Sequence, residues 1–228
     1  MTTLIAEDLL LLLLDDESGK FTSTSYLDTG IGGALLVELA LAGCVDVVKT
    51  SGLWARAKVL PTNTPPPADP VLTEAWELVR AKERGAQDLV VRLGKKRRDV
   101  LLGRLRERGI LEEREDRVLG LIPRRRWPTV DSTHESAVRR GLGDVLIRGV
   151  RPEPRTASLV AVLSALDLAH KVIDREGLPA RELKKRAKHV ADGDWAAKAV
   201  KDSIAAAQAA ITAAIVASTT AASASGSS

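Results

Sequence analysis

Apolar residues recur at helical spacing along most of the chain. Near the C-terminus, Val200, Ile204 and Ile211 follow one another in steps of four and seven, and residues 34–41 are leucine, alanine and valine interrupted by one glutamate. A period of three to four residues is typical of helices that bury one face, and glycine or proline separates the successive segments. The pattern predicts helices over residues 4–14, 30–43, 70–83, 90–109 (as one or two helices), 134–149, 155–173, 179–193 and 194–218.

Two shorter segments alternate between apolar and polar residues, as strands do. Residues 44–61, CVDVVKTSGLWARAKVLP, are compatible with a short hairpin that turns at Ser51–Gly52. Residues 110–128, ILEEREDRVLGLIPRRRWP, place two short apolar runs around the polar turn EEREDR. This second segment is expected to form a β-hairpin.

The chain shows no internal repeat and no break in composition. We therefore expect one domain over residues 1–218. Its predicted fold class is mainly α: a helix bundle ringed by shorter amphipathic helices and loops, with one small β-hairpin. Residues 219–228 contain only small residues, chiefly alanine, serine and threonine, and are expected to form a disordered tail.

A run of six leucines, Leu9–Leu14, is too short to cross a membrane, because a spanning helix needs about 20 apolar residues. Glu7 and Asp8 precede the run and three acidic residues follow it, whereas a signal peptide begins with positive charge and ends in small residues. The run is expected to be a short helix buried on most sides. The turn after it, DDESGK, contains Gly19, which suits a tight turn.

Composition adds little to this prediction of the fold. The 228 residues carry a formal net charge of +4 with 28% charged residues, which permits an anionic partner without requiring one. Cys44 is the only cysteine, so no intramolecular disulfide and no cysteine-based metal site can form. It lies in an apolar run and is expected to be a buried, inert thiol. The chain is expected to be cytoplasmic.

Signatures of catalysis are absent from the sequence. GIGGALL matches half of a dinucleotide-binding loop, but Leu35 stands where the third glycine belongs, and close packing of a helix explains the glycines better. His134 lacks the partners of a zinc-binding motif, His170 is expected to be a satisfied core histidine, and His189 is expected to be solvated. No nucleophile elbow or phosphate-binding loop occurs. We expect no enzyme activity, no cofactor and no metal.

The basic stretch VVRLGKKRRDVLLGRLRERGIL, residues 90–111, is the most informative segment for function. If it is helical, Arg92, Lys95 and Lys96 share a face, and Arg98 lies one turn beyond Lys95. Two cations at that spacing can grip a phosphate from two directions. Asp99 follows at a distance that equally allows local ion pairs on a solvated face. The residues themselves leave both interpretations open.

Two further functions remain as alternatives. The helix VLLGRLRERGIL leads into a hairpin that ends in PRRRWP, and this order resembles a winged-helix DNA-binding protein with a basic wing. A recognition helix normally follows another short helix, however, and the preceding RAKERGAQDLVVRLG is weakly patterned, so nucleic acid is not the expected partner. The other alternative is a scaffold that self-associates through the hairpin and has no lipid role.

Several stretches together resemble the Golgi phosphoprotein 3-like family, whose members include peripheral Golgi proteins that bind phosphatidylinositol 4-phosphate. In the family's order they are AEDLLLLLLDDESGK, GALLVELALAGCVDV, DPVLTEAWELV, RDVLLGRLRERGIL with its hairpin and RWP, and RTASLVAVLSALDLAHKVI. They cover nearly the whole chain, and the leucine run with D-D-E-x-G-K and E-L-A-L is quite specific. The resemblance implies a mainly helical fold with a hairpin that takes part in self-association.

The resemblance also implies a headgroup site made of two cations, an arginine and a tryptophan. The two cations fall on Lys95 and Arg98, and both are retained. The arginine position falls on Gly32 and the tryptophan position on or next to Ser23, so both of those side chains are lost. The nearest aromatic residues are out of register: Phe21 and Tyr26. Such a departure is expected to cost a few kcal/mol of headgroup binding, at about 1.5–3 kcal/mol for each charge-assisted hydrogen bond.

From residues and resemblance together, we expect a divergent family member: a non-enzymatic peripheral membrane protein that binds anionic, phosphoinositide-type headgroups. Lys95 and Arg98 are predicted to hold phosphate, with Arg92 and Arg97 as auxiliary charges. Homo-oligomerisation through the 110–122 hairpin and a protein cargo are expected as further partners. A basic patch is predicted to attract the anionic membrane surface, and it comprises Arg124, Arg125, Arg126, Arg181, Lys184 and Lys185.

Overall fold

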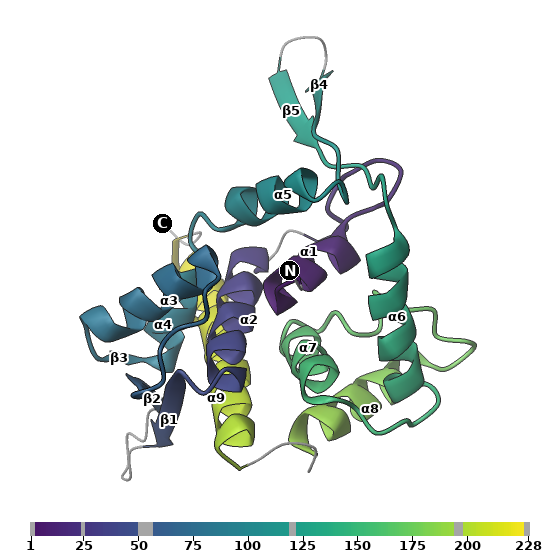
Figure 1. Cartoon of the computed structure of the whole chain (residues 1–228). Helices are drawn as coiled ribbons and strands as arrows, with labels where there is room; N and C mark the ends of the chain where they lie inside the picture. Colours follow the sequence, from purple (N-terminus) through teal and green to yellow (C-terminus); the bar gives the residue numbers. More distant parts are fainter. Residues whose placement is uncertain (1–2, 24–25, 50–56, 119–121, 194–197, 226–228) are drawn as a thin grey trace.

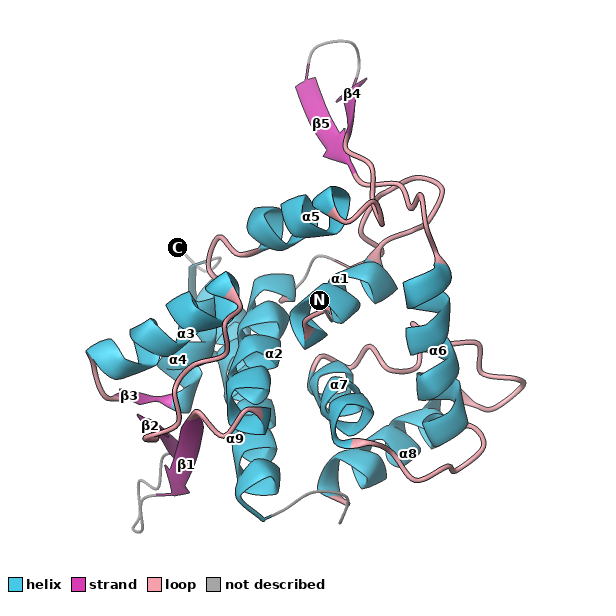
Figure 2. Ribbon diagram, in the orientation of Figure 1, coloured by secondary structure: helices cyan, strands magenta, loops and turns pink. Residues whose placement is uncertain are grey.

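Helices make up most of the computed structural model, which describes residues 3–23, 26–49, 57–118, 122–193 and 198–225. Figure 1 shows their arrangement, and Figure 2 distinguishes helices, strands and loops. The elements, in chain order, are α1 (Ile5–Leu13), α2 (Leu27–Leu41), β1 (Val45–Lys49), β2 (Ala57–Pro61), α3 (Pro70–Ala81), β3 (Arg84–Gly85), α4 (Ala86–Gly94), α5 (Arg98–Glu107), β4 (Arg114–Val118), β5 (Ile122–Arg126), α6 (Thr133–Leu146), α7 (Pro154–Ala165), α8 (Ala180–Asp192) and α9 (Lys198–Ser225). The predicted mainly α class is confirmed.

Helix α2 lies at the centre of the bundle and packs against α1, α4, α7 and α9 (Figure 1). Its glycines allow this close packing. A Cβ added to Gly32 would lie 1.9 Å from the carbonyl oxygen of Val90 in α4, and one added to Gly94 would lie 1.7 Å from the carbonyl oxygen of Asp28 in α2. The backbones of α2 and α4 are therefore in direct contact. GIGG is a helix-packing motif here, as expected, and not a dinucleotide loop.

Helix α1 is buried along its whole length, as the leucine run predicted. Its two carboxylates, Glu7 and Asp8, are buried with it and have cationic partners on other elements. Burial without such partners would cost several kcal/mol for each charge. Within the described part of the chain, no helix is long and apolar enough to cross a membrane.

The strands form two small antiparallel sheets. β1 pairs with β2, with Val47 opposite Val59, and β3 adds a third short strand. The hairpin that residues 44–61 allowed is thus present, although its expected turn at Ser51–Gly52 lies outside the described residues. β4 and β5 form the hairpin expected over residues 110–128, and Figure 1 shows this hairpin projecting beyond α5, away from the rest of the fold.

Two helix ends differ from the prediction. Helix α7 ends at Ala165 instead of residue 173, because Asp167 has a left-handed φ of 57° that ends the helical path, and the apolar residues that follow are buried as a loop. Helix α9 continues to Ser225, beyond its predicted end at residue 218, so residues 219–225, which were expected to be a tail, are helical. Alanine is the best helix former, and the hydroxyl of Thr220 donates to the carbonyl oxygen of Val216 within the helix (3.1 Å).

Candidate functional site

The predicted cations lie at a break between two helices. Helix α4 ends at Gly94, Lys96 has a left-handed φ of 59°, and α5 begins at Arg98. Lys95 is therefore in the connecting turn, while Arg98 is in the first turn of α5. Residues 90–109 thus contribute to two helices, which is one of the two possibilities left open by the sequence, and these cations do not share one helical face. Glycine is a poor helix former, and Gly94 is held against α2, so the chain changes direction here.

Three of the four predicted headgroup cations are paired with acids inside the protein. The pairs are Arg92 with Asp88 (2.9 Å), Arg97 with Glu74, and Arg98 with Asp28 (2.9 Å). Local ion pairs thus form, as one interpretation of the sequence allowed, but not with Asp99. Lys95 is exposed and has no acidic partner in the described part of the chain. The auxiliary charges predicted at Arg92 and Arg97 are consequently offset by their neighbours.

A small cleft of about 250 Å³ lies beside Arg98. The Arg98 guanidinium carbon lies 5.6 Å from the centroid of the Phe21 ring, within the range of a cation–π contact. The Arg98 side chain donates from Nη2 to Asp28, yet its Nε is buried without a hydrogen-bond partner in the described residues. An unsatisfied buried donor of a charged group is costly and marks a position where an acceptor fits. The residues lining the cleft are Gly19, Lys20, Phe21, Arg98, Asp99, Leu102, Arg125 and Trp127.

The turn at Gly19 holds the cleft together. Gly19 has a φ of 60°, and a Cβ at this position would lie 2.4 Å from the backbone nitrogens of Trp127 and Pro128. The backbone N–H of Trp127 donates to the carbonyl oxygen of Gly19 (3.0 Å), and the Trp127 side chain is only 6% exposed. This contact fixes the segment carrying Lys20 and Phe21 against the base of the hairpin.

Lys20, Phe21 and Trp127 were not identified as site residues from the sequence. Helical periodicity carries no information about them, because all three lie in connecting segments. The two motifs that contain or adjoin them, DDESGK and RWP, were the available signal.

The surroundings of Gly32 and Ser23 differ from what the resemblance implies for the arginine and tryptophan positions. Gly32 faces the α4 backbone and has no room for any side chain. Ser23 lines a different cleft, with Leu12 and Arg139. Phe21, although out of register, supplies an aromatic ring beside Arg98.

The predicted membrane-surface patch does not form one surface. Arg125 is at the hairpin, where it lies 3.5 Å from Glu113, whereas Arg181, Lys184 and Lys185 are on α8. Figure 1 shows α8 at the end of the molecule opposite the hairpin. Lys184 is also paired with Asp167 (2.7 Å). Arg126 lies in β5 beside Arg125, and the side chain of Arg124 lies outside the described part.

His134 makes two short contacts through a single ring nitrogen. Nε2 of His134 lies 2.7 Å from Oδ1 of Asp8 and 2.9 Å from the hydroxyl of Thr3. Both partners use the same ring nitrogen, so the three groups cannot relay a proton as a triad does. His134 thus has partners that the sequence did not identify, and the hydrogen bond to Asp8 raises the pKa of His134. In the described residues, no three metal-binding side chains are clustered.

The other two histidines, His170 and His189, differ in burial. His170 lies in the loop after α7 and is only partly buried, and its Nδ1 has no partner in the described residues, so the expectation of a satisfied core histidine is wrong. Burial lowers the pKa of His170. His189 is exposed on α8, as expected.

Arg155 joins the buried carboxylates of α1 and α2. Its guanidinium donates to Asp8 (2.7 Å) and to Glu38 (3.0 Å). Burial opposes ionisation of Asp8, but the hydrogen bonds from His134 and Arg155 outweigh it and lower the pKa of that carboxyl. Burial raises the pKa of Glu38 to about 7. These groups stabilise the packing of α1, α2, α6 and α7.

Helix α5 has the connectivity but not the free charges of a DNA-recognition helix. It follows α4 through a short turn and precedes the hairpin, so the upstream helix that the sequence did not indicate is present. Its arginines, however, are engaged within the protein. The pairs are Arg104 with Glu7 and Asp69, Arg106 with Glu113, and Arg108 with Glu7.

Comparison with known proteins identifies a family. The family model described as Golgi phosphoprotein 3 (GPP34) matches residues 5–207. No curated protein matches the chain.

Proposed function

The chain belongs to the Golgi phosphoprotein 3 (GPP34) family, and on that premise we propose that it is a non-enzymatic protein that binds phosphorylated lipid headgroups at a membrane surface. The cleft beside Arg98 is the proposed headgroup site. The single observation that carries the proposal is the buried, unpartnered Nε of Arg98 in a cleft that also contains Lys20 and Arg125.

The chemistry of the cleft suits a phosphorylated, ring-shaped headgroup. A phosphate oxygen can accept from Arg98 Nε and so satisfy the buried donor. Arg98 and Asp99, in the first turn of α5, line the cleft, and α5 has no side-chain cap. A helix N-terminus favours anions. Phe21 and Trp127 supply apolar walls that can pack against the C–H face of an inositol ring. Lys95, exposed in the turn before α5, adds a positive charge close to Arg98 in the sequence.

We expect the double variant Lys95→Glu, Arg98→Gln to lose binding to phosphoinositide vesicles. Removing one guanidinium and reversing one exposed charge takes away at least one charge-assisted contact, so binding should weaken about tenfold or more. Glutamine at position 98 avoids placing a second carboxylate beside Asp28. The measurement is flotation with vesicles of neutral lipid alone, with phosphatidylinositol, or with phosphatidylinositol 4-phosphate, at two salt concentrations.

The matched control is Arg140→Glu with Arg175→Gln. Both residues are exposed and lie outside the cleft. The two substitutions change the net charge by the same amount as Lys95→Glu with Arg98→Gln. The control should float like the wild-type protein, and both double variants should unfold within about 1 kcal/mol of it. Flotation of the Lys95, Arg98 variant at the wild-type level, or a wild-type protein that never floats, would contradict the proposal. Equal loss in the control would show that only net charge matters.

We also propose that the hairpin contributes to self-association. β4 and β5 project from the fold (Figure 1), and a two-stranded hairpin by itself is marginally stable in water. The segment VLGLI at residues 118–122 adds apolar residues to the hairpin beyond those that one face of it requires. A second copy of the chain can cover them.

Replacing residues 115–124 with two glycines should therefore lower the apparent mass in solution. The replacement leaves Leu111 and Trp127, which are buried at the base of the hairpin, in place, and it keeps Arg125 for the headgroup cleft. Light scattering across a concentration series is the measurement. An unchanged mass, or a wild-type protein that is monomeric throughout, would argue against this role of the hairpin.

A further inference from the structure

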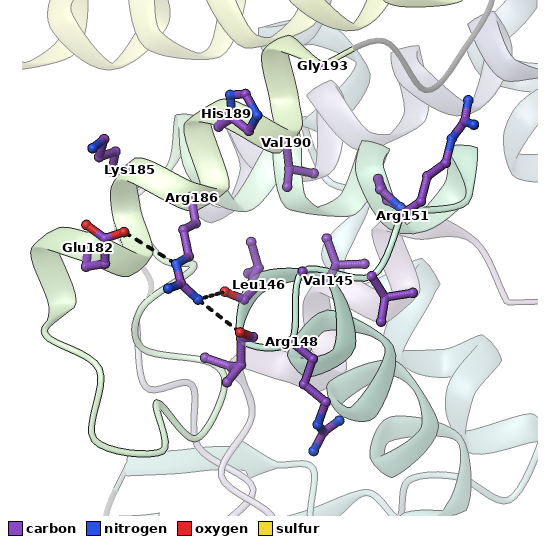
Figure 3. Close-up of a pocket in the computed structure, with 14 residues that line it drawn as sticks. Val145, Leu146, Arg148, Arg151, Glu182, Lys185, Arg186, His189, Val190 and Gly193 are labelled. Atoms are coloured by element: carbon purple, nitrogen blue, oxygen red, sulfur yellow. Dashed lines mark hydrogen bonds and ion pairs between the residues drawn. The ribbon is translucent and has the colours of Figure 1, made fainter.

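A groove separate from the headgroup cleft lies between α8 and the segment that joins α6 to α7 (Figure 3). Its volume is about 640 Å³, within the usual range of binding sites. Val145, Val150 and Val190 contribute apolar surface to it. Val150 is 52% exposed, which is high for a large apolar side chain. A second cavity, bounded by Pro179 and Arg181, shares Glu182 and Lys185 with the groove and so extends it along α8.

Arg186 fixes the two walls of the groove relative to each other. It donates from Nη1 to the carbonyl oxygens of Leu146 (3.2 Å) and Ile147 (2.9 Å), and from Nε to Glu182 (3.4 Å). Figure 3 shows this side chain reaching across from α8 to the end of α6. Because the last carbonyls of a helix carry partial negative charge, Arg186 neutralises the end of α6. The charged groups of Arg186 and Glu182 are thus engaged in contacts that hold the two walls together.

The rim of the groove has unpaired positive charge on both sides. Arg151 extends from the α6–α7 segment, and Lys185 and His189 extend from α8 (Figure 3). The positive charge comes from Arg151 and Lys185, and neither has an acidic partner among the described residues. Arg148, by contrast, is paired with Asp144 and Glu176. Among the described residues, the one acidic side chain that lines the groove is Glu182, which already binds Arg186.

We propose that this groove binds an acidic segment of a partner protein in extended conformation, with an apolar side chain over the valines and carboxylates at the cationic rim. The length of the groove along α8 suits a peptide. The 13 residues of α8 span about 20 Å, which corresponds to about six residues of extended chain. A compact small molecule would leave the second cavity empty. A membrane is a poor occupant, because α8 lies at the end of the molecule opposite α5 and the hairpin (Figure 1).

The test uses a fluorescein-labelled seven-residue peptide with a central leucine and three acidic residues on each side. Its anisotropy is measured against the full chain in the absence of vesicles. We expect saturable binding that weakens with salt, and at least tenfold weaker binding of the amide peptide, in which glutamine and asparagine replace the acids. A peptide with serine in place of leucine should bind several-fold more weakly, because it cannot cover the valines.

The variant Arg151→Glu, Lys185→Glu should bind the acidic peptide at least tenfold more weakly than wild type. Both side chains are exposed, so the fold should be retained, and circular dichroism checks this. The matched control Arg140→Glu, Arg175→Glu has the same net charge and leaves the groove unchanged, so it should bind like wild type. Val150→Ser should reduce binding of the leucine peptide but not of the serine peptide.

Several results would overturn the proposal. They are equal binding of the acidic and amide peptides, no saturation at millimolar protein, equal loss in the control variant, and complete competition by millimolar inorganic phosphate or decanoate, which would identify a small-anion site instead. The lipid proposal is tested separately, because Lys95→Glu, Arg98→Gln should leave peptide binding unchanged and Arg151→Glu, Lys185→Glu should leave flotation unchanged.

Discussion

Replacing Gly94 with alanine is expected to lower the free energy of unfolding by about 3 kcal/mol. The added Cβ would lie 1.7 Å from the carbonyl oxygen of Asp28 and 3.0 Å from the backbone nitrogen of Gly32. These are main-chain atoms, so no rotamer change can relieve the clash, and α4 must move away from α2. The loss is measured by urea denaturation followed by circular dichroism.

The matched control for Gly94 is Gly141→Ala in α6. Nothing lies within 4 Å of a Cβ at this position. Alanine is a better helix former than glycine, so this variant should be about 0.5–1 kcal/mol more stable than wild type. The same substitution is thus expected to act in opposite directions at the two sites. If Gly94→Ala were neutral, α2 and α4 could not be in backbone contact.

Replacing Arg104 with methionine is expected to destabilise the fold by about 3–5 kcal/mol. Arg104 donates to Glu7 (2.8 Å), whose side chain has 0% exposure, and forms two hydrogen bonds with Asp69 (2.8 and 2.5 Å). Burial opposes ionisation of Asp69, but Arg104 outweighs it and lowers the pKa of that carboxyl. Without the guanidinium, the two carboxylates would lose the positive charge that offsets their burial. Arg108 would be the remaining cationic partner of Glu7.

The control for Arg104 is Arg106→Met on the same helix. Arg106 is 49% exposed and pairs with Glu113 at the surface, where an ion pair is worth about 0–1 kcal/mol. The free energies of unfolding of the two variants, obtained from denaturation curves, should therefore differ by several kcal/mol. Similar curves would mean that the Glu7 cluster contributes no more than a surface pair.

The order and type of the helices could be predicted from local pattern. The helical spacing of apolar residues predicted α1, α2, α6 and α8. Helix α3 begins at residue 70, as predicted, and the Asp69 side chain accepts there from the backbone N–H of Val71. Such signals act over a few residues, which is the distance over which helices form and end. They do not report what a residue meets from elsewhere in the chain.

The candidate site was predicted only in part, because it is built from such distant contacts. Lys95 and Arg98 were identified, but the helix break between them depends on how Gly94 packs against α2. The cleft depends on Gly19 meeting Trp127, more than 100 residues later in the sequence. The charge of a residue is visible in the sequence, but a distant partner is not: Arg97 and Arg98 look free until the fold places Glu74 and Asp28 beside them. The pair of Arg92 with Asp88, in contrast, lies within α4.

The contact between Gly32 and the α4 backbone restricts how this chain can evolve. An arginine restored at position 32 by a single substitution would meet the carbonyl oxygen of Val90, an atom that every residue type carries at that position. Restoring arginine at position 32 therefore requires α4 to shift first, and the intermediate variants would be less stable than the present protein. Under the proposed function, selection for tighter headgroup binding has an easier route through the residues around the cleft, such as Lys20 and Phe21. The loss at position 32 is in this sense irreversible, and descendants are expected to diversify at the cleft while keeping glycine there.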